Sequence, residues 1–161
     1  MPLILEESNY FQNMSTIPSY EISFIGYRLD SKVATLPHDS GVYLIYRCIY
    51  NAEKNEVQLK ELFFIGKATD LYQEVGHHKR RDEFLAKAQK GEEICYSYAL
   101  VDKKQYDIIE NALIFMQKPK LNTNLRDSYD HQDAEFHFSG RCAKLKTHDY
   151  KIESGILTRL P

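Results

Sequence analysis

The 161-residue sequence lacks a strong net charge and lacks the cysteine patterns of disulfide or zinc proteins. Its formal charge is -2, so the chain as a whole does not attract polyanions, and any nucleic-acid surface must be a local patch. Cys48, Cys95 and Cys142 are widely separated and form no C-x-x-C pair, which fits reduced thiols in a cytosolic protein. The sequence also has no internal repeat, coiled-coil heptad or zinc-finger motif.

Long hydrophobic runs are also missing. The first residues, MPLILEESNYF, have no basic segment and only a short apolar run, so we expect neither a signal peptide nor a membrane span, and a cytoplasmic location. The length suits one compact domain. We expect an N-terminal arm and strand at 1–40, a central domain at 41–126, and a C-terminal β extension at 127–161 that packs on the same domain.

Three segments have the composition of β-strands. The runs near 41–50, 57–67 and 93–101 are rich in β-branched and aromatic residues and predict a three-stranded antiparallel sheet. Helices are predicted at 69–91 and at about 103–117, the second ended by the proline that follows. The chain should therefore be an α/β (α+β) protein whose sheet is flanked by helices, with further β-like extensions at both ends.

Turn and cap residues refine these boundaries. Thr69 and Asp70 are candidate N-caps of the first helix, Gly91 is a candidate C-cap, and Gly76 is a point where the helix can bend or divide. In the C-terminal extension, alternating apolar residues predict strands that turn at Ser139–Gly140.

Polar groups stand at the ends of these elements. Alternation of side chains along paired strands can bring Tyr43 close to Phe64, with Gly66 thinning the backbone nearby and Lys67 at the strand end. Glu110 lies at the rim of the apolar stripe of the later helix. Taken alone, Tyr43 is more often a core aromatic than a catalytic base.

The first helix carries three polar residues at helical spacing. Glu74, His78 and Arg81 follow an i, i+4, i+7 pattern and should face one direction. Taken alone, His78 and its neighbour His77 are more often solvated helix residues, and no Cys/His set supports zinc. A basic run around Arg81 is compatible with either a solvated face or a phosphate contact.

Together these segments resemble the GIY-YIG nuclease domain superfamily. GVY at Gly41–Tyr43, FIG at Phe64–Gly66 and ENALIFMQKPKLN at Glu110–Asn122 follow the order of the family's motifs. The resemblance covers Gly41–Asn124 and is to the catalytic domains of homing endonucleases and of the incision subunit of bacterial excision repair. It implies the small antiparallel sheet described above.

The resemblance also implies a function, the metal-dependent hydrolysis of phosphodiester bonds in a nucleic acid, with DNA as the expected partner. By resemblance, Tyr43 holds or deprotonates the attacking water, and Glu110 binds a single Mg²⁺ or Mn²⁺ ion. A free tyrosine has a pKa of about 10, so Tyr43 needs a nearby cation to act as a base near neutral pH. The implied catalytic residues are Tyr43, His78, Lys67 and Glu110, and the implied substrate-binding residues are Lys67, His78, Arg81 and Asn122.

Two positions depart from the family pattern. Glu74 stands where the family has a transition-state arginine, and Phe64 stands where it has the second signature tyrosine. Loss of a phosphate-stabilising arginine can lower a rate by about three to five decades. Arg80 or Arg81 would have to replace it from farther along the chain. The alternatives are therefore a catalytically silent nucleic-acid-binding module, or a structural or protein-interaction domain on the same fold.

Overall fold

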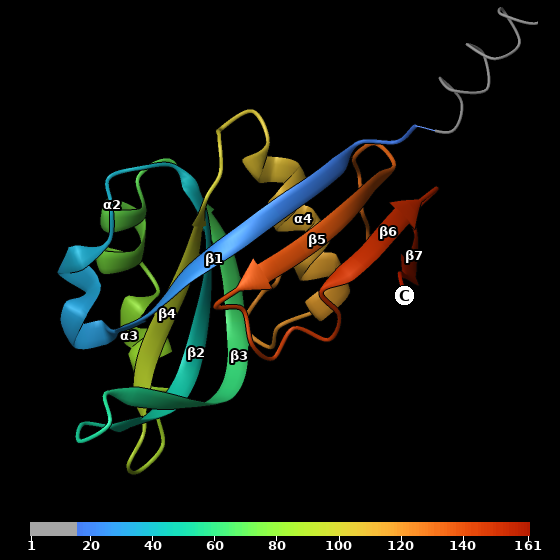
Figure 1. The fold of residues 1–161 in the computed structure, drawn as a ribbon. Helices are drawn as coiled ribbons and strands as arrows, with labels where there is room; N and C mark the ends of the chain where they lie inside the picture. The colour runs from blue at the N-terminus through green and yellow to red at the C-terminus, as the bar shows by residue number, and fades with distance from the viewer. Residues whose placement is uncertain (1–15) are drawn as a thin grey trace, which may run out of the picture.

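The computed structural model of the protein describes residues 16–161, and the first part of the predicted N-terminal arm lies outside this range (Figure 1). The fold is α+β, with one curled sheet of seven strands in the order β3-β2-β4-β1-β5-β6-β7. The elements are β1 (Ser19–Leu29), η1 (Asp30–Thr35), β2 (Gly41–Asn51), β3 (Glu56–Ala68), α2 (Leu71–Gly76), α3 (Arg81–Leu85), β4 (Glu93–Leu100), α4 (Tyr106–Gln117), β5 (Ala134–Gly140), β6 (Asp149–Glu153) and β7 (Ile156–Arg159).

The prediction of a three-stranded sheet is wrong in extent. The three predicted strands are present and antiparallel, with β2 between β3 and β4, but the sheet continues beyond them. The second half of β1 pairs antiparallel with β4, and Ser19–Phe24 pairs parallel with Glu135–Gly140 of β5. The two extensions therefore join each other across more than a hundred residues of sequence, a contact that alternation along each strand does not encode.

Helices cover opposite faces of the sheet (Figure 1). Along β2, alternate residues enter two separate apolar clusters. Leu44 and Tyr46 point toward α4 and the larger cluster, whereas Tyr43 and Ile45 point toward α2 and α3. The sheet is therefore buried on both sides along its central strands. Within residues 16–161, no helix is long and apolar enough to cross a membrane.

The segment predicted to be helical at 69–91 divides at Gly76, which is one of the two alternatives that the sequence left open, and forms the short helices α2 and α3. Its helical part ends at Leu85, before the predicted C-cap at Gly91. The predicted cap is present: the Asp70 carboxylate accepts a hydrogen bond from the Gln73 backbone N–H at 3.1 Å. The helix ends at Gly76, and just beyond it the His78 Nδ1 accepts from the Arg80 N–H at 2.9 Å and stabilises a turn. The side chains after Gly76 therefore face other directions than they would on one continuous helix.

The C-terminal turn lies at a different place from the predicted one. Gly140 ends β5 instead of turning a hairpin, and a Cβ there would overlap the carbonyl oxygen of Phe24 on β1. The tight hairpin joins β6 to β7 at Ser154–Gly155, whose φ angles of 51° and 76° are those of a type I′ turn. Gly140 is thus needed for close strand packing.

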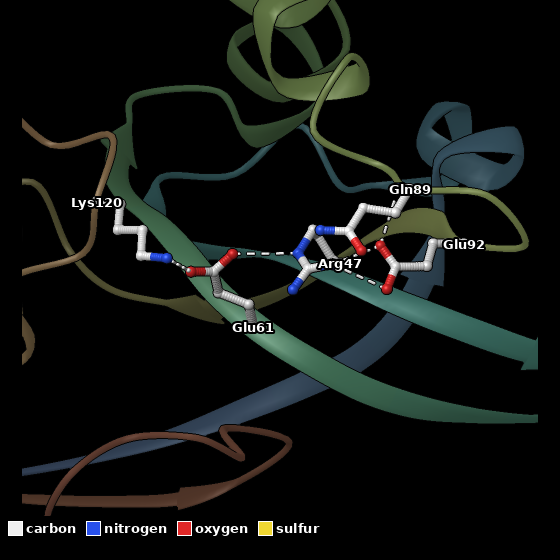
Figure 2. Close-up of polar contacts among 5 residues, drawn as sticks. All are labelled: Arg47, Glu61, Gln89, Glu92 and Lys120. Atoms are coloured by element: carbon white, nitrogen blue, oxygen red, sulfur yellow. Dashed lines mark hydrogen bonds and ion pairs between the residues drawn. The ribbon is translucent and has the colours of Figure 1, made fainter.

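An ion-pair network ties the far end of this sheet to neighbouring loops (Figure 2). Arg47 on β2 donates to Glu61 on β3 at 3.1 Å and to both oxygens of Glu92 at 2.6 and 2.8 Å. Lys120, in the loop after α4, pairs with Glu61 at 3.0 Å, and Glu92 also accepts from the Gln89 N–H at 2.9 Å. The network joins two strands to the loops before β4 and after α4.

Arg47 should contribute more to stability than the other cation of this network. Its side chain is 16% exposed, so Arg47→Ala should lower the free energy of unfolding by about 1.5–3 kcal/mol through lost charge-assisted hydrogen bonds. Lys120 is 81% exposed, so Lys120→Ala should cost less than about 1 kcal/mol. Urea unfolding of the two variants measures both effects. Equal losses would contradict this ranking.

Candidate active site

The candidate site depends on a contact between Tyr43 and Gly66. The two residues are register partners on β2 and β3, and Tyr43 is only 1% exposed. A Cβ at position 66 would overlap the Cζ and Oη atoms of Tyr43. Glycine therefore lets the tyrosine ring lie across β3, which is one of the two edge strands of the described sheet. Phe64 pairs with Ile45, and its ring centroid lies 6.2 Å from that of Tyr43.

The Tyr43 hydroxyl is surrounded by negative charge. Burial raises the pKa of Tyr43 well above its ordinary value, and the carboxylates of Glu74 and Glu110 raise it further. In the protein by itself, Tyr43 therefore stays protonated near neutral pH and can donate a hydrogen bond.

Glu110 reaches the same edge from the opposite face of the sheet. It lies in the first half of α4, whose apolar side packs on the larger cluster. Burial raises the pKa of Glu110 to about 7, with Asp107 and Glu74 adding to the effect and Lys67 opposing it. Its carboxyl group therefore lacks a full counter-charge, which is the condition under which a bound cation is most favourable.

His78 presents one defined ring nitrogen to this cluster. Its Nδ1 accepts the Arg80 N–H, so the neutral ring carries its proton on Nε2, which lies 3.5 Å from Glu74 Oε1. The ring contacts Phe64 edge-on, with centroids 5.7 Å apart, and burial lowers the pKa of His78. His78 is thus a neutral donor near neutral pH.

A groove of about 190 Å³ opens beside these residues. Phe64, Arg80 and Glu110 line it, together with the segment 122–125. The Arg80 guanidinium lies 5.4 Å from the ring centroid of Phe64 and donates to the Leu121 carbonyl at 2.9 Å. It also forms a two-point ion pair with Glu83, at 2.9 and 3.1 Å. The phenyl ring at position 64 thus serves as a platform for a cation. The guanidinium of this groove belongs to Arg80, which the sequence indicated only as an alternative to Arg81.

The other predicted substrate-binding residues have partners of their own. Arg81 donates to Asp30 at 2.6 Å, because the helix break between α2 and α3 removes the predicted alignment with Glu74. Lys67 forms an ion pair with Asp107.

Asn122 is held by the sheet edge. Its buried side chain accepts from the Ile65 N–H at 3.0 Å and donates to the Ile65 carbonyl at 2.8 Å. Next to it, the Leu121 N–H donates to the Phe63 carbonyl at 3.0 Å. These bonds cover the edge of β3 and fix one wall of the groove.

Within residues 16–161, no three His, Cys, Asp or Glu side chains are arranged to hold a metal ion. Any cation at this groove would therefore rest on one or two carboxylates plus ligands from water or substrate. That donor set suits Mg²⁺ or Mn²⁺, which bind through few carboxylates and keep several waters.

One comparison with known proteins finds a relative. The chain is 30% identical over 103 residues to the UvrABC system protein C of Malacoplasma penetrans (strain HF-2). The match covers 63% of this chain and 16% of that protein, so the chain spans only a small part of the relative's length. No family model and no solved structure matches the chain.

The fit between Tyr43 and Gly66 can be tested by adding one methyl group. Gly66→Ala should lower the free energy of unfolding by about 1–3 kcal/mol, because the Tyr43 ring must move. Gly76→Ala is the control, since its Cβ would meet only Val33 Cγ2 at 3.9 Å. In a Tyr43→Ala background the cost of Gly66→Ala should shrink. An unchanged cost, measured by urea unfolding, would contradict the contact.

Glu110 should make stability depend on pH. Its pKa is raised from 4.5 to about 7, so the stability that its protonated form contributes is full below about pH 4.5 and is lost as pH rises through about 7. In chelator-treated buffer, the free energy of unfolding should fall less between about pH 5 and 8 in Glu110→Gln than in the wild type. The exposed Glu53→Gln serves as control. Parallel pH profiles for all three proteins would contradict a raised pKa.

Proposed function

We propose that this protein is a GIY-YIG-type endonuclease that hydrolyses phosphodiester bonds in DNA with one divalent cation, at an attenuated rate. The observation that carries the proposal is the gathering of Tyr43, Glu110 and Arg80 at the edge of β3. The Tyr43 ring lies over Gly66, close enough to Glu110 for that carboxylate to raise its pKa, and Arg80 lines the groove with Glu110. The similarity to UvrABC system protein C supports it.

Glu110 would hold the cation. Its buried carboxyl group has acidic neighbours, and only Lys67, which is itself paired with Asp107, offsets their charge. Bound Mg²⁺ or Mn²⁺ would supply positive charge that stabilises the phosphate and the leaving oxygen. The two carboxylates nearest to Tyr43 are Glu110 and Glu74, so Glu74 is positioned to assist in holding the cation.

The remaining side chains orient the substrate. Tyr43 donates a hydrogen bond through its hydroxyl and aligns the attacking water, and its proton can leave only when positive charge offsets the neighbouring carboxylates. His78 Nε2–H and the Arg80 guanidinium are donors for phosphate oxygens beside Phe64, and Arg80 would exchange its ion pair with Glu83 for the phosphate. Asn122 is a positioning residue, since both ends of its amide bind the backbone of Ile65.

Glu74 accounts for the attenuation. It places a carboxylate next to Tyr43 and close enough to Glu110 to raise that residue's pKa. Negative charge at this point repels a phosphate and opposes the loss of the Tyr43 proton. The same observation favours a second candidate function, a module that binds nucleic acid without cutting it.

Nicking of supercoiled plasmid DNA in the presence of Mn²⁺ distinguishes the two functions. We expect metal-dependent nicking by the wild type and a fall of about 10²-fold in the rate of Arg80→Ala, the loss typical of one preorganised donor. Lys79→Ala removes the same charge from an exposed neighbouring position and should change the rate by less than about twofold.

Loss of nicking in Tyr43→Phe and Glu110→Gln would support the assignment of both residues. Equal rates for Arg80→Ala and Lys79→Ala would remove Arg80 from phosphate binding. A wild type that binds DNA but does not nick it with Mg²⁺ or Mn²⁺ would establish the binding module instead.

A further inference from the structure

A second hollow, of about 590 Å³, lies away from the candidate active site and shares no lining residue with its groove. It is bordered by the second half of β1, by η1 and by the tip of the β2–β3 hairpin, which curls away from the body of the sheet (Figure 1). We call it the hairpin groove. Its lining residues are Gly26, Tyr27, Arg28, Leu29, Lys32, Tyr50, Asn55, Glu56, Val57 and Arg141.

Positive charge gathers in the hairpin groove although the chain as a whole carries a charge of -2. Arg28, Lys32 and Arg141 come from three different segments, and Glu56 is the carboxylate among the lining residues. Lys32 and Arg141 are exposed, and neither side chain forms an ion pair or hydrogen bond within residues 16–161. Their charges are therefore available to an anionic partner.

Arg28 has a different part in the groove. It donates to the backbone oxygen and hydroxyl of Thr35 at 3.0 and 2.8 Å, and the Thr35 hydroxyl donates to the Lys32 carbonyl at 2.6 Å. These bonds fix η1 against β1. Lys32 therefore belongs to a short helix whose position these hydrogen bonds fix.

Two tyrosines line the hairpin groove together with the cations. The Tyr50 hydroxyl donates to Asn55 at 2.9 Å, which holds the ring across the hairpin. The Tyr27 ring packs edge-on against Tyr46, with centroids 5.5 Å apart, and its hydroxyl accepts the Ala143 N–H at 3.1 Å. Both rings are anchored and half-buried, so they offer preformed surfaces for stacking.

The backbone of β1 is also available at this point. Strand β5 pairs with β1 only as far as Phe24, and Arg141 follows at once. From Gly26 to Leu29 the described residues place β4 on one side of β1 and the hairpin groove on the other. Unpaired backbone groups of a strand edge are further hydrogen-bonding partners for a ligand.

We propose that the hairpin groove binds a single-stranded segment of nucleic acid, with Lys32 and Arg141 on its phosphates and Tyr50 under a base. Cations that follow a backbone and aromatic rings that accept any base are the usual components of such sites. The proposal rests on the proposed function for the identity of the ligand and gives the nuclease a second hold on its substrate away from the cutting groove.

Fluorescence anisotropy with a labelled oligothymidylate of about 15 nucleotides tests the proposal. The double variant Lys32→Gln/Arg141→Gln should weaken binding at least about tenfold and reduce the salt dependence by a slope of about 1.4, the value for two phosphate contacts on a single strand. Tyr50→Ala should weaken binding at least about fivefold. Lys90→Gln/Lys104→Gln, at two exposed lysines outside the hairpin groove, is the matched control and should bind like the wild type.

The outcomes separate this proposal from the proposed nuclease function. Unchanged binding by the groove variants, or an equal loss in the control, would overturn the proposal even if the protein nicks plasmid DNA. Selective loss in the groove variants would support it even if no nicking occurs. Circular dichroism spectra of the variants check that each is folded. Arg141→Gln alone gives a second measurement if the double variant fails to fold, since the Arg141 side chain forms no ion pair or hydrogen bond among residues 16–161.

Discussion

The lack of a side chain at Gly66 is the constraint on which the candidate site depends. Tyr43 belongs to the face of the sheet that α2 and α3 cover, whereas Glu110 belongs to a helix on the other face. Glu110 is close enough to raise the pKa of Tyr43, and the tyrosine ring reaches this edge strand by lying over a glycine. A Cβ at position 66 would overlap the Tyr43 ring, so the ring would have to move away from this position.

The groove is rigid because the exposed edge of β3 is covered. Asn122 imitates a strand partner through its side chain, and Leu121 through its backbone. The same loop is tied to the sheet again through Lys120 and the Arg47 network (Figure 2). This loop helps to hold Arg80 in place, because the Arg80 guanidinium donates a hydrogen bond to the Leu121 carbonyl. The position of the Arg80 guanidinium therefore depends in part on contacts made elsewhere in the loop after α4.

Local sequence signals predicted the central strands and the Asp70 cap, because periodicity and capping act over a few residues. They did not predict the parallel pairing of β1 with β5, which is a contact between distant segments. The helix break after Gly76 determines which arginine lines the groove, because it directs Arg81 toward Asp30 and leaves Arg80 in the groove lining. The run of basic residues at 79–81 indicated a cation near the site, but the sequence did not show which of these residues would line the groove. The boundaries of the central domain, 41–126, stay a prediction.

The most direct test of the account is plasmid nicking by Glu74→Arg in Mn²⁺. If a carboxylate beside Tyr43 attenuates a nuclease, a positive charge at this position should raise the rate at least about tenfold, and Tyr43→Phe in the same background should abolish the gain. The contrary result is a wild type that already nicks DNA rapidly and is slowed by Glu74→Ala. Glu74 would then take part in catalysis, and its description as an attenuating residue would be wrong.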